Sequence, residues 1–294
     1  MARIDWKGVI IPRVKDLVSS YVYRPTLRQV FYRLVAALLI PNTEVTYKGL
    51  SRATVLAREE RTLDPLCFDD RIRTHTEGDH GFTGINGFLN TCKFWIKDLP
   101  EQYTRRLWAG QETTPIIWLE KDALLTPVST IAEPYRVKVY AARGYSSFTA
   151  VYQAALEIDG SNPTKVLQLT DFDPSGEDMV RDLENRLERY GASDFEVEKI
   201  ALNLDQVNTL GLPPMPAKTS DPRYDRFAAS YGEECVELDA LPPDELDSIV
   251  TAAIESLIDQ EAWDSLKEEI EAEREKVQER IDKLAESLDE LDEE

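Results

Sequence analysis

The chain has 294 residues, a length typical of about two domains, and a formal net charge of −21. Its three cysteines, Cys67, Cys92 and Cys235, lie far apart and form no CxxC pair, which argues against a disulfide framework and against a zinc site. The longest apolar run, residues 34–41, is far shorter than the ~20 residues of a membrane helix, and the first residues form no apolar signal region. We therefore expect a soluble, cytoplasmic protein that does not enter a membrane.

The negative charge is concentrated near the C-terminus. Residues 233–294 contain 24 acidic and 5 basic residues, whereas residues 1–110 contain 12 acidic and 17 basic ones. The intervening segment, 111–232, contains 19 acidic and 12 basic residues. The N-terminal segment therefore has the charge expected of a surface that faces DNA phosphates. Its basic side chains include Arg24, Arg28, Arg33, Lys48, Arg52, Arg58, Arg61, Arg71 and Arg73.

Residues 1–110 are predicted to form a small helical domain. A helix near 6–22 precedes a second helix over 26–40, and a turn at Lys48-Gly49 precedes a third helix over 51–60. This arrangement suits a helix-turn-helix or winged-helix module. The second helix has an apolar stripe with a 3.6-residue period, formed by Leu27, Val30, Phe31, Leu34, Val35 and Leu38.

Tyr32 lies at the edge of that stripe, one helical turn from Arg28, so the two side chains share a face. A tyrosine in this position is usually an amphipathic residue at the rim of the core. Further along, His75 and His80 flank Glu77 and Asp79. Neighbouring glycines indicate a loop there, and we do not favour a metal site.

Strand and helix patterns alternate through the next segment. The predicted order is a buried strand within 114–121, a helix over 122–132, a strand over 137–142 and a helix that begins near 146, followed by a strand over 165–170, a helix over 174–190 and a strand over 195–201. Short alternation of this kind predicts an α/β fold with a parallel, doubly wound sheet.

Three acidic residues follow the ends of two of these strands. Asp171 and Asp173 come directly after one strand and point in the same direction, while Glu120 ends another. The carboxyl ends of parallel strands meet at one edge, so the three carboxylates could bind one divalent cation. Asp173 alone could be only the N-cap of a helix that has Pro174 at its first position. Asp171 has no such structural role.

The C-terminal region contains proline-rich connectors at 210–216 and 237–243 and a predicted helix over 244–260. A heptad pattern with one polar seam position, Glu273, follows. This helix either packs on its own domain or forms a dimer seam or docking helix, and we favour association. Its glutamates form either a solvated face or a shield against unbound DNA. The apolar seam residues are Trp263, Leu266, Ile270, Val277, Ile281, Leu284, Leu288 and Leu291.

Several short motifs resemble one protein family. Glu120 followed by Asp171-x-Asp173 is similar to the Toprim signature of topoisomerases, primases and related nucleases. The words Trp118-Leu119-Glu120-Lys121, Gly144-Tyr145-Ser146-Ser147 and Asp173-Pro174-Ser175-Gly176 resemble the branch that contains the A subunit of topoisomerase VI and the eukaryotic meiotic break-forming transesterases. The shortness of the chain is most similar to the stand-alone "Mini-A" members. The resemblance spans about residues 24–239.

The resemblance implies three regions. They are a winged-helix-like DNA-binding domain with the tyrosine (1–110), a Toprim metal-binding domain (111–232) and an acidic helical C-terminal region (233–294). It also implies that Tyr32 is the nucleophile towards double-stranded DNA and that Arg28 stabilises charge on the phosphate. Glu120, which is also a catalytic residue, would bind Mg²⁺ together with Asp171 and Asp173.

The same resemblance implies a homodimer in which the tyrosine of one protomer works with the metal site of the other, giving a double-strand break. The sequence contains no ATPase motif of the GxxxxGK(S/T) type, so any energy coupling would need a separate ATPase partner. Two alternatives stay open. One is a Toprim nuclease that uses a metal-activated water, and the other is a non-catalytic DNA-binding module.

Overall fold

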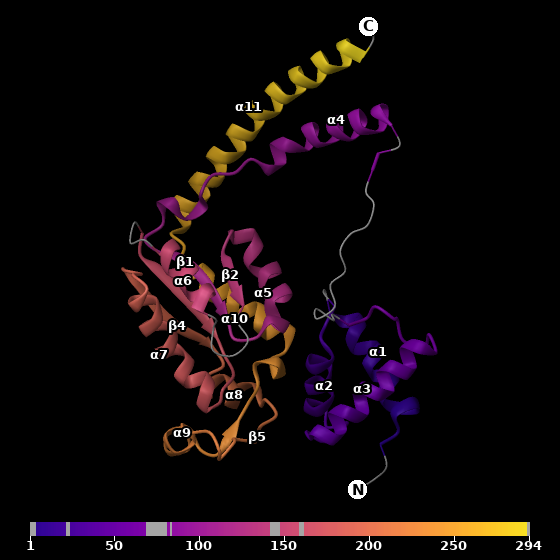
Figure 1. Cartoon of the computed structure of the whole chain (residues 1–294), viewed down its shortest axis with the longest axis vertical. Helices are drawn as coiled ribbons and strands as arrows, with labels where there is room; N and C mark the ends of the chain where they lie inside the picture. The colour runs from indigo at the N-terminus through magenta and orange to yellow at the C-terminus, as the bar shows by residue number, and fades with distance from the viewer. Residues whose placement is uncertain are drawn as a thin grey trace. The chain divides into compact units, whose positions relative to one another are not determined.

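The computed structural model forms two compact units, the first made of residues 1–72 and 113–256 and the second of 73–112 and 257–294 (Figure 1). These units do not coincide with the three regions expected from the sequence, because residues 73–112 group with the C-terminal helix. The residues that the structure describes are 4–21, 24–68, 81–82, 84–141, 148–158 and 162–292, with side chains up to residue 285.

The first unit begins with helices. A π-helical turn, η1 (Trp6–Ile10), leads into α1 (Ile11–Ser20), and α2 (Leu27–Ala36) and α3 (Glu44–Glu59) follow. A capping box starts α2, because the Gln29 N–H donates to the Thr26 hydroxyl (3.3 Å) and the Thr26 N–H donates to the Gln29 side chain (2.8 Å). The predicted helical character is confirmed. The described residues between 4 and 68 contain no strand that could serve as a wing.

The predicted turn at Lys48-Gly49 is wrong. Both residues lie inside α3, which starts earlier, at the N-cap Thr43. Gly49 has a packing role instead, since a Cβ on this residue would lie 2.6 Å from the Trp6 ring. The glycine therefore permits close approach of η1 to α3.

A four-stranded parallel sheet forms the centre of the first unit, with the strand order β2-β1-β3-β4. This confirms the predicted α/β class and parallel sheet. The strands are β1 (Thr114–Leu119), β2 (Lys138–Ala141), β3 (Thr164–Leu169) and β4 (Phe195–Ala201). The connecting helices are η3 (Asp122–Leu124), α5 (Leu125–Ala132), η4 (Glu133–Tyr135), α6 (Phe148–Glu157) and α7 (Pro174–Arg189).

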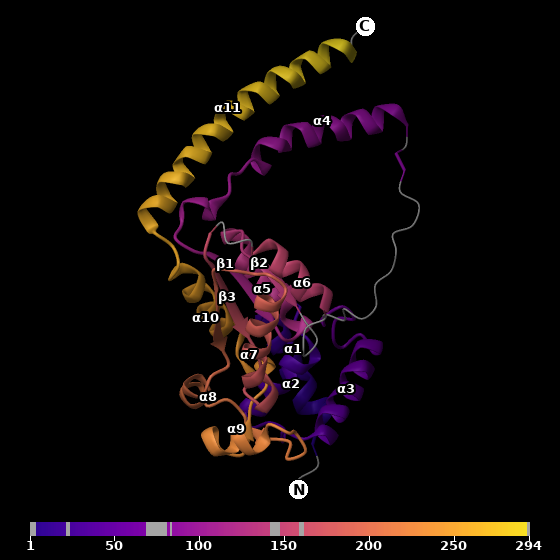
Figure 2. The ribbon, with the colours of Figure 1, turned by 60° about the vertical axis from the view of Figure 1, so that its left-hand side comes forward.

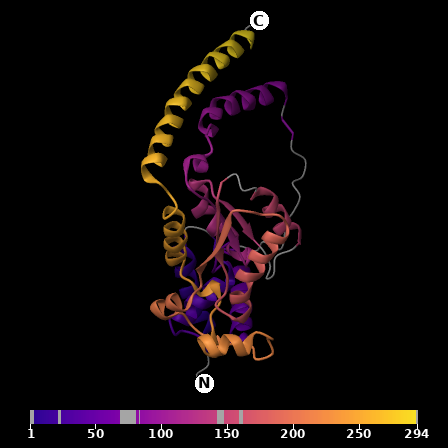
Figure 3. The same ribbon diagram turned by 90° about the vertical axis from the view of Figure 1, so that its left-hand side faces the viewer.

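The strand order places a change of winding direction between β1 and β3. The chain moves from β1 to β2 on one side, and from β3 to β4 on the other. Right-handed crossovers then put α5 on one face and α6 and α7 on the opposite face. Figures 2 and 3 show α6 and α7 on one side of the sheet and α10 (Pro243–Glu255) on the other.

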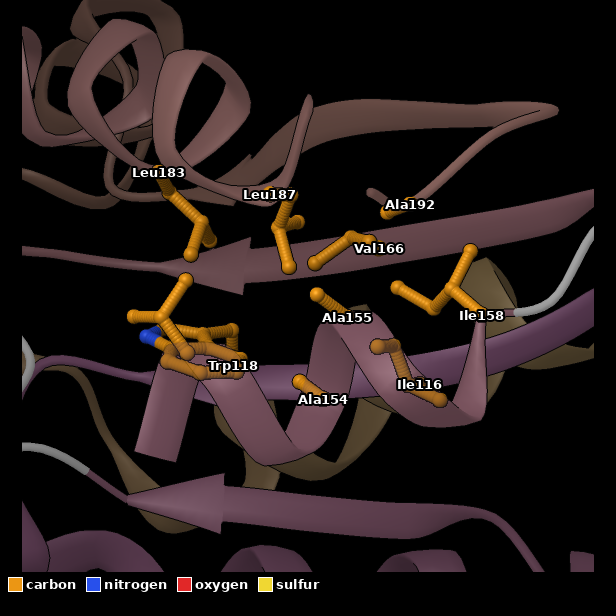
Figure 4. Packing of buried hydrophobic residues seen from close by; sticks show 10 residues of the cluster. Ile116, Trp118, Ala154, Ala155, Ile158, Val166, Leu183, Leu187 and Ala192 are labelled. Carbon is orange, nitrogen blue, oxygen red and sulfur yellow. The ribbon is translucent and has the colours of Figure 1, made fainter. Parts of the chain in front are cut away.

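The core under α6 and α7 explains why these helices dock where they do. Trp118 of β1 and Val166 of β3 point from the sheet towards Ala155 of α6 and Leu187 of α7, and all four are buried (Figure 4). The small alanines let α6 lie close to the strands. The polar groups described below belong to residues that follow the carboxyl ends of β1 and β3.

The rest of the first unit follows β4. It contains α8 (Leu204–Leu210), α9 (Tyr224–Tyr231), η5 (Leu238–Ala240) and α10, with a short antiparallel pair of β5 (Met215–Pro216) and β6 (Glu234–Cys235). The predicted helix over 244–260 is therefore α10, which ends earlier. A bridge between Phe172 and Val236, with N–H···O distances of 2.8 and 2.9 Å, brings the segment before η5 beside the Asp-x-Asp motif.

The second unit pairs α4 (Ile85–Gln102) and the short helix η2 (Leu107–Gly110) with α11 (Gln260–Asp292). The Trp263 ring packs on Trp108 with ring centroids 5.2 Å apart, and Ile270 is buried. The polar seam residue Glu273 accepts a hydrogen bond from the Tyr103 hydroxyl at 2.7 Å. The first half of the heptad seam is therefore occupied within the chain, as the packing alternative expected.

Candidate active site

The candidate site lies at the carboxyl ends of β1 and β3, where the winding direction changes. Open α/β sheets place their ligands at this kind of position. Glu120 directly follows β1, and Asp171 follows β3 by two residues. The Asp171 N–H donates to Oε2 of Glu120 at 2.8 Å. The two residues that the sequence places at neighbouring strand ends are thus in direct contact.

Burial dominates the electrostatics of this pair. Glu120 is 8% exposed and Asp171 is 7% exposed. Burial, followed by repulsion from Asp171 and Asp173, raises the pKa of Glu120 to about 7. Burial also raises the pKa of Asp171, against the attraction of Lys121. Burial therefore favours the protonated form of both carboxyl groups when no cation is bound.

Asp173 has a structural role in this arrangement. Its Oδ1 accepts hydrogen bonds from the Gly176 N–H (2.6 Å) and the Ser175 hydroxyl (2.9 Å), so it caps α7. A Cβ at Gly176 would lie 2.1 Å from the Asp171 carbonyl oxygen, which is why a glycine stands there. Among the described residues, no three His, Cys, Asp or Glu side chains form a ready metal-binding group. Coordination by Glu120, Asp171 and Asp173 together stays a prediction.

Lys121 is the positive centre of the site. Its Nζ lies 2.8 Å from Oδ1 of Asp171, 2.9 Å from Oε2 of Glu237 and 3.4 Å from Oδ2 of Asp239. The Leu238 N–H also donates to Oδ1 of Asp171, at 2.7 Å. The segment 237–239 is thereby fixed against the strand ends.

Sequence reasoning missed the roles of Lys121, Glu237 and Asp239. Lys121 occurs in the sequence analysis only as the last residue of the motif Trp118-Leu119-Glu120-Lys121, in which no role was assigned to the lysine. Glu237 and Asp239 lie in a proline-rich connector. A Glu-x-Asp pattern in a connector is a weak signal by itself. Its meaning depends on the bridge between Phe172 and Val236, which the sequence does not reveal.

A second lysine supports the backbone of the site from β4. Nζ of Lys199 donates to the Asp171 carbonyl oxygen at 3.1 Å and lies 2.6 Å from Oε1 of Glu177. Burial lowers the pKa of this lysine, against the attraction of Glu177. The contact fixes the turn between β3 and α7.

The helix α2 brings Arg28 and Tyr32 to the same region. The Arg28 guanidinium forms an ion pair with Glu237, and its Nε lies 3.7 Å from Oδ2 of Asp239. Its central carbon lies 6.0 Å from the Tyr32 ring centroid, which confirms that the two side chains share a face. Glu237 therefore pairs with Arg28 from α2 and with Lys121 from the sheet edge.

Tyr32 is only 3% exposed, so it does not extend into water as a rim tyrosine would. Burial, together with Glu237, raises the pKa of Tyr32 to about 12. The charges of Arg28 and Lys121 and a hydrogen bond with Arg28 act in the opposite direction. The phenol is thus protonated at neutral pH, and its ionisation depends on how these charges are balanced.

Some sequence-based interpretations fall outside the residues or side chains that the structure describes. They are the histidine pair His75 and His80 with Glu77 and Asp79, the motif Gly144-Tyr145-Ser146-Ser147, the basic residues Arg71 and Arg73, and the seam residues Leu288 and Leu291.

No protein-family model and no curated protein matches the chain. The resemblance to the topoisomerase VI A family therefore depends on the motifs themselves. In the part of the chain that the structure describes, no helix is long and apolar enough to cross a membrane. The fold and site together define an α/β protein with buried carboxylates and a lysine at the switch point of a parallel sheet.

Proposed function

We propose that the chain is a Toprim-type, Mg²⁺-dependent DNA-cleaving transesterase with Tyr32 as its nucleophile. The observation that carries the proposal is the shared carboxylate Glu237, which pairs with Arg28 of the tyrosine helix and with Lys121 at the sheet edge. The proposed nucleophile and the proposed metal ligands therefore belong to one compact unit.

The donor set fits a hard divalent cation. Carboxylate oxygens are the ligands that Mg²⁺ prefers. The Lys121 ammonium against Asp171 already serves as a stand-in cation. The pKa of Glu120, raised first by burial and then by repulsion from Asp171 and Asp173, belongs to a carboxyl group whose ionised form a cation would stabilise. When bound, Mg²⁺ would be held by Glu120, Asp171 and Asp173 and would supply Lewis-acid charge to the scissile phosphate.

Arg28 and Tyr32 would carry out the remaining steps of the reaction. Arg28 would bind the phosphate through its planar guanidinium and stabilise the charge that develops on it. The Tyr32 oxygen would form a bond to phosphorus while the bond from phosphorus to a deoxyribose oxygen breaks. The phenol proton passes to solvent and the leaving oxygen takes up a proton. The phosphotyrosyl link conserves the bond energy, so rejoining the strand requires no ATP for the chemistry.

We further propose that two such chains act together as a homodimer, since two single-strand cuts make one double-strand break. A separate ATPase partner would be needed only for coupling to strand movement. The exposed basic side chains of α3, among them Lys48 and Arg52, would face the DNA backbone.

The test is a covalent protein–DNA adduct. Incubation with supercoiled DNA and Mg²⁺ or Mn²⁺, stopped with detergent, should leave protein attached to DNA ends. Tyr32→Phe should lose the adduct entirely, at a cost of about 1 kcal/mol in stability for the lost hydrogen bond. Tyr47→Phe is the matched control. The ring of Tyr47 packs edge-on against that of Phe31, with the ring centroids 5.3 Å apart. Its hydroxyl has no assigned role, so the adduct should persist in Tyr47→Phe.

One alternative has structural support. The burial of Tyr32 and its raised pKa favour a metal-dependent nuclease in which water attacks the phosphate. Cleavage that persists in Tyr32→Phe with free DNA ends would establish that nuclease. No adduct and no cleavage with any divalent metal would leave the DNA-binding module.

A further inference from the structure

Lys121 is enclosed by carboxylates from two separate segments. Asp171 belongs to the turn after β3, whereas Glu237 and Asp239 belong to the segment at η5. Although burial lowers it, attraction to Asp171, Asp239 and Glu237 raises the pKa of Lys121 above its ordinary range. The ammonium is therefore charged, mostly buried and fixed by three acceptors.

The contact with Asp171 occupies one of the two carboxylate oxygens that could bind a metal ion. Oδ1 of Asp171 receives both Lys121 Nζ at 2.8 Å and the Leu238 N–H at 2.7 Å. A divalent cation and an ammonium group cannot occupy the same side of one carboxylate oxygen. Metal binding through Oδ1 of Asp171, in either monodentate or bidentate form, therefore requires Lys121 to move or to give up this contact.

The same cluster contains a buried carboxylate oxygen, Oδ1 of Asp239, that could accept a further hydrogen bond or cation. Asp239 is 3% exposed, and its buried Oδ1 has no hydrogen-bond partner among the described residues. Among the described residues, Glu120, Asp171, Glu237 and Asp239 share the cations Lys121 and Arg28, while the nearby Lys199 is paired with Glu177, so their ionised forms leave excess negative charge. The cluster can bind a further cation once one of its carboxylate oxygens is released from its present partner.

A DNA phosphate could open that position. Lys121 has a flexible four-carbon stem and a compact ammonium group, which make lysine an effective phosphate ligand. Arg28 and Lys121 both pair with Glu237 and Asp239, so these two carboxylates engage the cations that a phosphate would attract. Exchange of carboxylate for phosphate would release Lys121 from Asp171 while the total number of charge contacts is maintained.

We propose that Lys121 is a positioning residue that occupies the cation-binding side of Asp171 until a DNA phosphate draws it away, so that divalent metal and DNA bind cooperatively. The proposal rests on the proposed function and adds to it an order in which DNA and metal bind. The metal ligands become available only when the substrate is present. Metal-dependent side reactions in the absence of DNA are thereby suppressed.

The first test measures Mn²⁺ binding without DNA, by calorimetry on the full chain. Wild type should bind weakly, and Lys121→Met should bind about tenfold more tightly or better, because a unit positive charge beside the ligand is removed. Lys218→Met is the matched control. It removes the same charge from an exposed position in the same unit and should match wild type.

Lys121→Met leaves the buried carboxylate of Asp171 without its ion-pair partner and weakens the pairing of Glu237 and Asp239, which keep Arg28, so the variant could unfold the site. The double variant Lys121→Met, Glu237→Gln removes one positive and one negative charge, which keeps the charge of the cluster constant. It should fold, as judged by circular dichroism, and should also bind Mn²⁺ more tightly than wild type.

The second test uses linkage, because cooperativity must be reciprocal. Fluorescence anisotropy of a labelled duplex should show that Mn²⁺ tightens DNA binding by wild type and by Lys218→Met. In the Lys121 variants this enhancement should be reduced, since metal no longer competes with a lysine and only its direct attraction to the phosphate is left. Equal Mn²⁺ affinity in wild type and both Lys121 variants would overturn the proposal.

The results separate this proposal from the proposed function. If Mn²⁺ binding responds to Lys121 but no covalent adduct forms, the lysine competition stands and the transesterase fails. If the adduct forms but the Lys121 variants bind Mn²⁺ as wild type does, only the competition fails. If no protein binds Mn²⁺, with or without DNA, both this proposal and the metal-dependent function fail.

Discussion

Replacement of Glu120 by glutamine should make the first unit more stable at alkaline pH in the absence of metal. The side chain is 8% exposed and its carboxyl pKa is raised from 4.5 to about 7 by burial and by the neighbouring aspartates. A glutamine oxygen can still accept the hydrogen bond that the Asp171 N–H donates to Oε2, at 2.8 Å in the wild type. The substitution therefore removes the charge and retains the contact.

The sign and the size of this change in the free energy of unfolding follow from the pKa of Glu120 in the folded and unfolded states. A carboxyl group with a higher pKa in the folded state binds more protons when folded, so its contribution to stability is complete below pH 4.5 and is lost as the pH rises through 7. The difference of about 2.5 pKa units corresponds to roughly 3 kcal/mol above pH 8. Glu120→Gln should therefore match wild type near pH 4.5 and exceed its free energy of unfolding by about 2–3 kcal/mol at pH 8.5.

Hydrogen exchange measured by mass spectrometry is a suitable assay, because peptides from β1 and β3 report the first unit independently of the second. Comparison of variant and wild type at the same pH cancels the intrinsic pH dependence of exchange, and EDTA keeps the site free of metal. Glu133→Gln changes an exposed carboxyl group and should stay within about 0.5 kcal/mol of wild type at both pH values. A stability difference for Glu120→Gln that is the same at pH 5 and pH 8.5 would refute this account of the buried charge.

Three further predictions follow from the packing and from the proposed chemistry. Gly176→Ala should lower the stability of the first unit by about 1–3 kcal/mol in urea unfolding, because its Cβ would lie 2.1 Å from the Asp171 carbonyl oxygen. Trp263→Ala should cost about 3–5 kcal/mol of packing in the second unit and speed its proteolysis, while the first unit retains adduct formation. Mixing Tyr32→Phe with Glu120→Gln protomers should restore the adduct if each tyrosine acts with the metal site of the partner, whereas a site formed within one chain predicts no adduct from the mixture.

The sheet could be predicted because its signal is local. Each strand is a short apolar run with its own boundaries, and the observed strands differ from the predicted ones by only one or two residues. The turn at Lys48-Gly49 was wrongly predicted for the opposite reason. A glycine usually marks a break, but Gly49 is explained by the distant Trp6 ring. Contacts between residues far apart in the sequence decide such positions.

The candidate site likewise contains residues whose positions follow from local sequence patterns and residues whose positions depend on long-range contacts. Parallel strands bring their carboxyl ends to one edge, so the proximity of Glu120 and Asp171 could be expected from the predicted parallel sheet. Glu237 and Asp239 reach the site through contacts between distant segments, among them the bridge between Phe172 and Val236 and the hydrogen bond from the Leu238 N–H to Asp171. The grouping of 73–112 with 257–294 depends in the same way on packing of α4 against α11, and neither helix reveals the other in its sequence.

The charge network around Lys121 is difficult to explain by stability. Burying ion pairs costs desolvation that the attraction between the charges barely offsets, and apolar contacts of similar size are often more stable. A protein that needed only to attach α2 to the sheet edge could do so with leucine and valine. Ion pairs between Glu237, Arg28 and Lys121 have a property that apolar contacts lack, since a phosphate can replace the carboxylate. In the proposed mechanism, the groups that hold the tyrosine helix in place would therefore be the groups that respond to DNA, and this response would link substrate binding to the arrangement of the site.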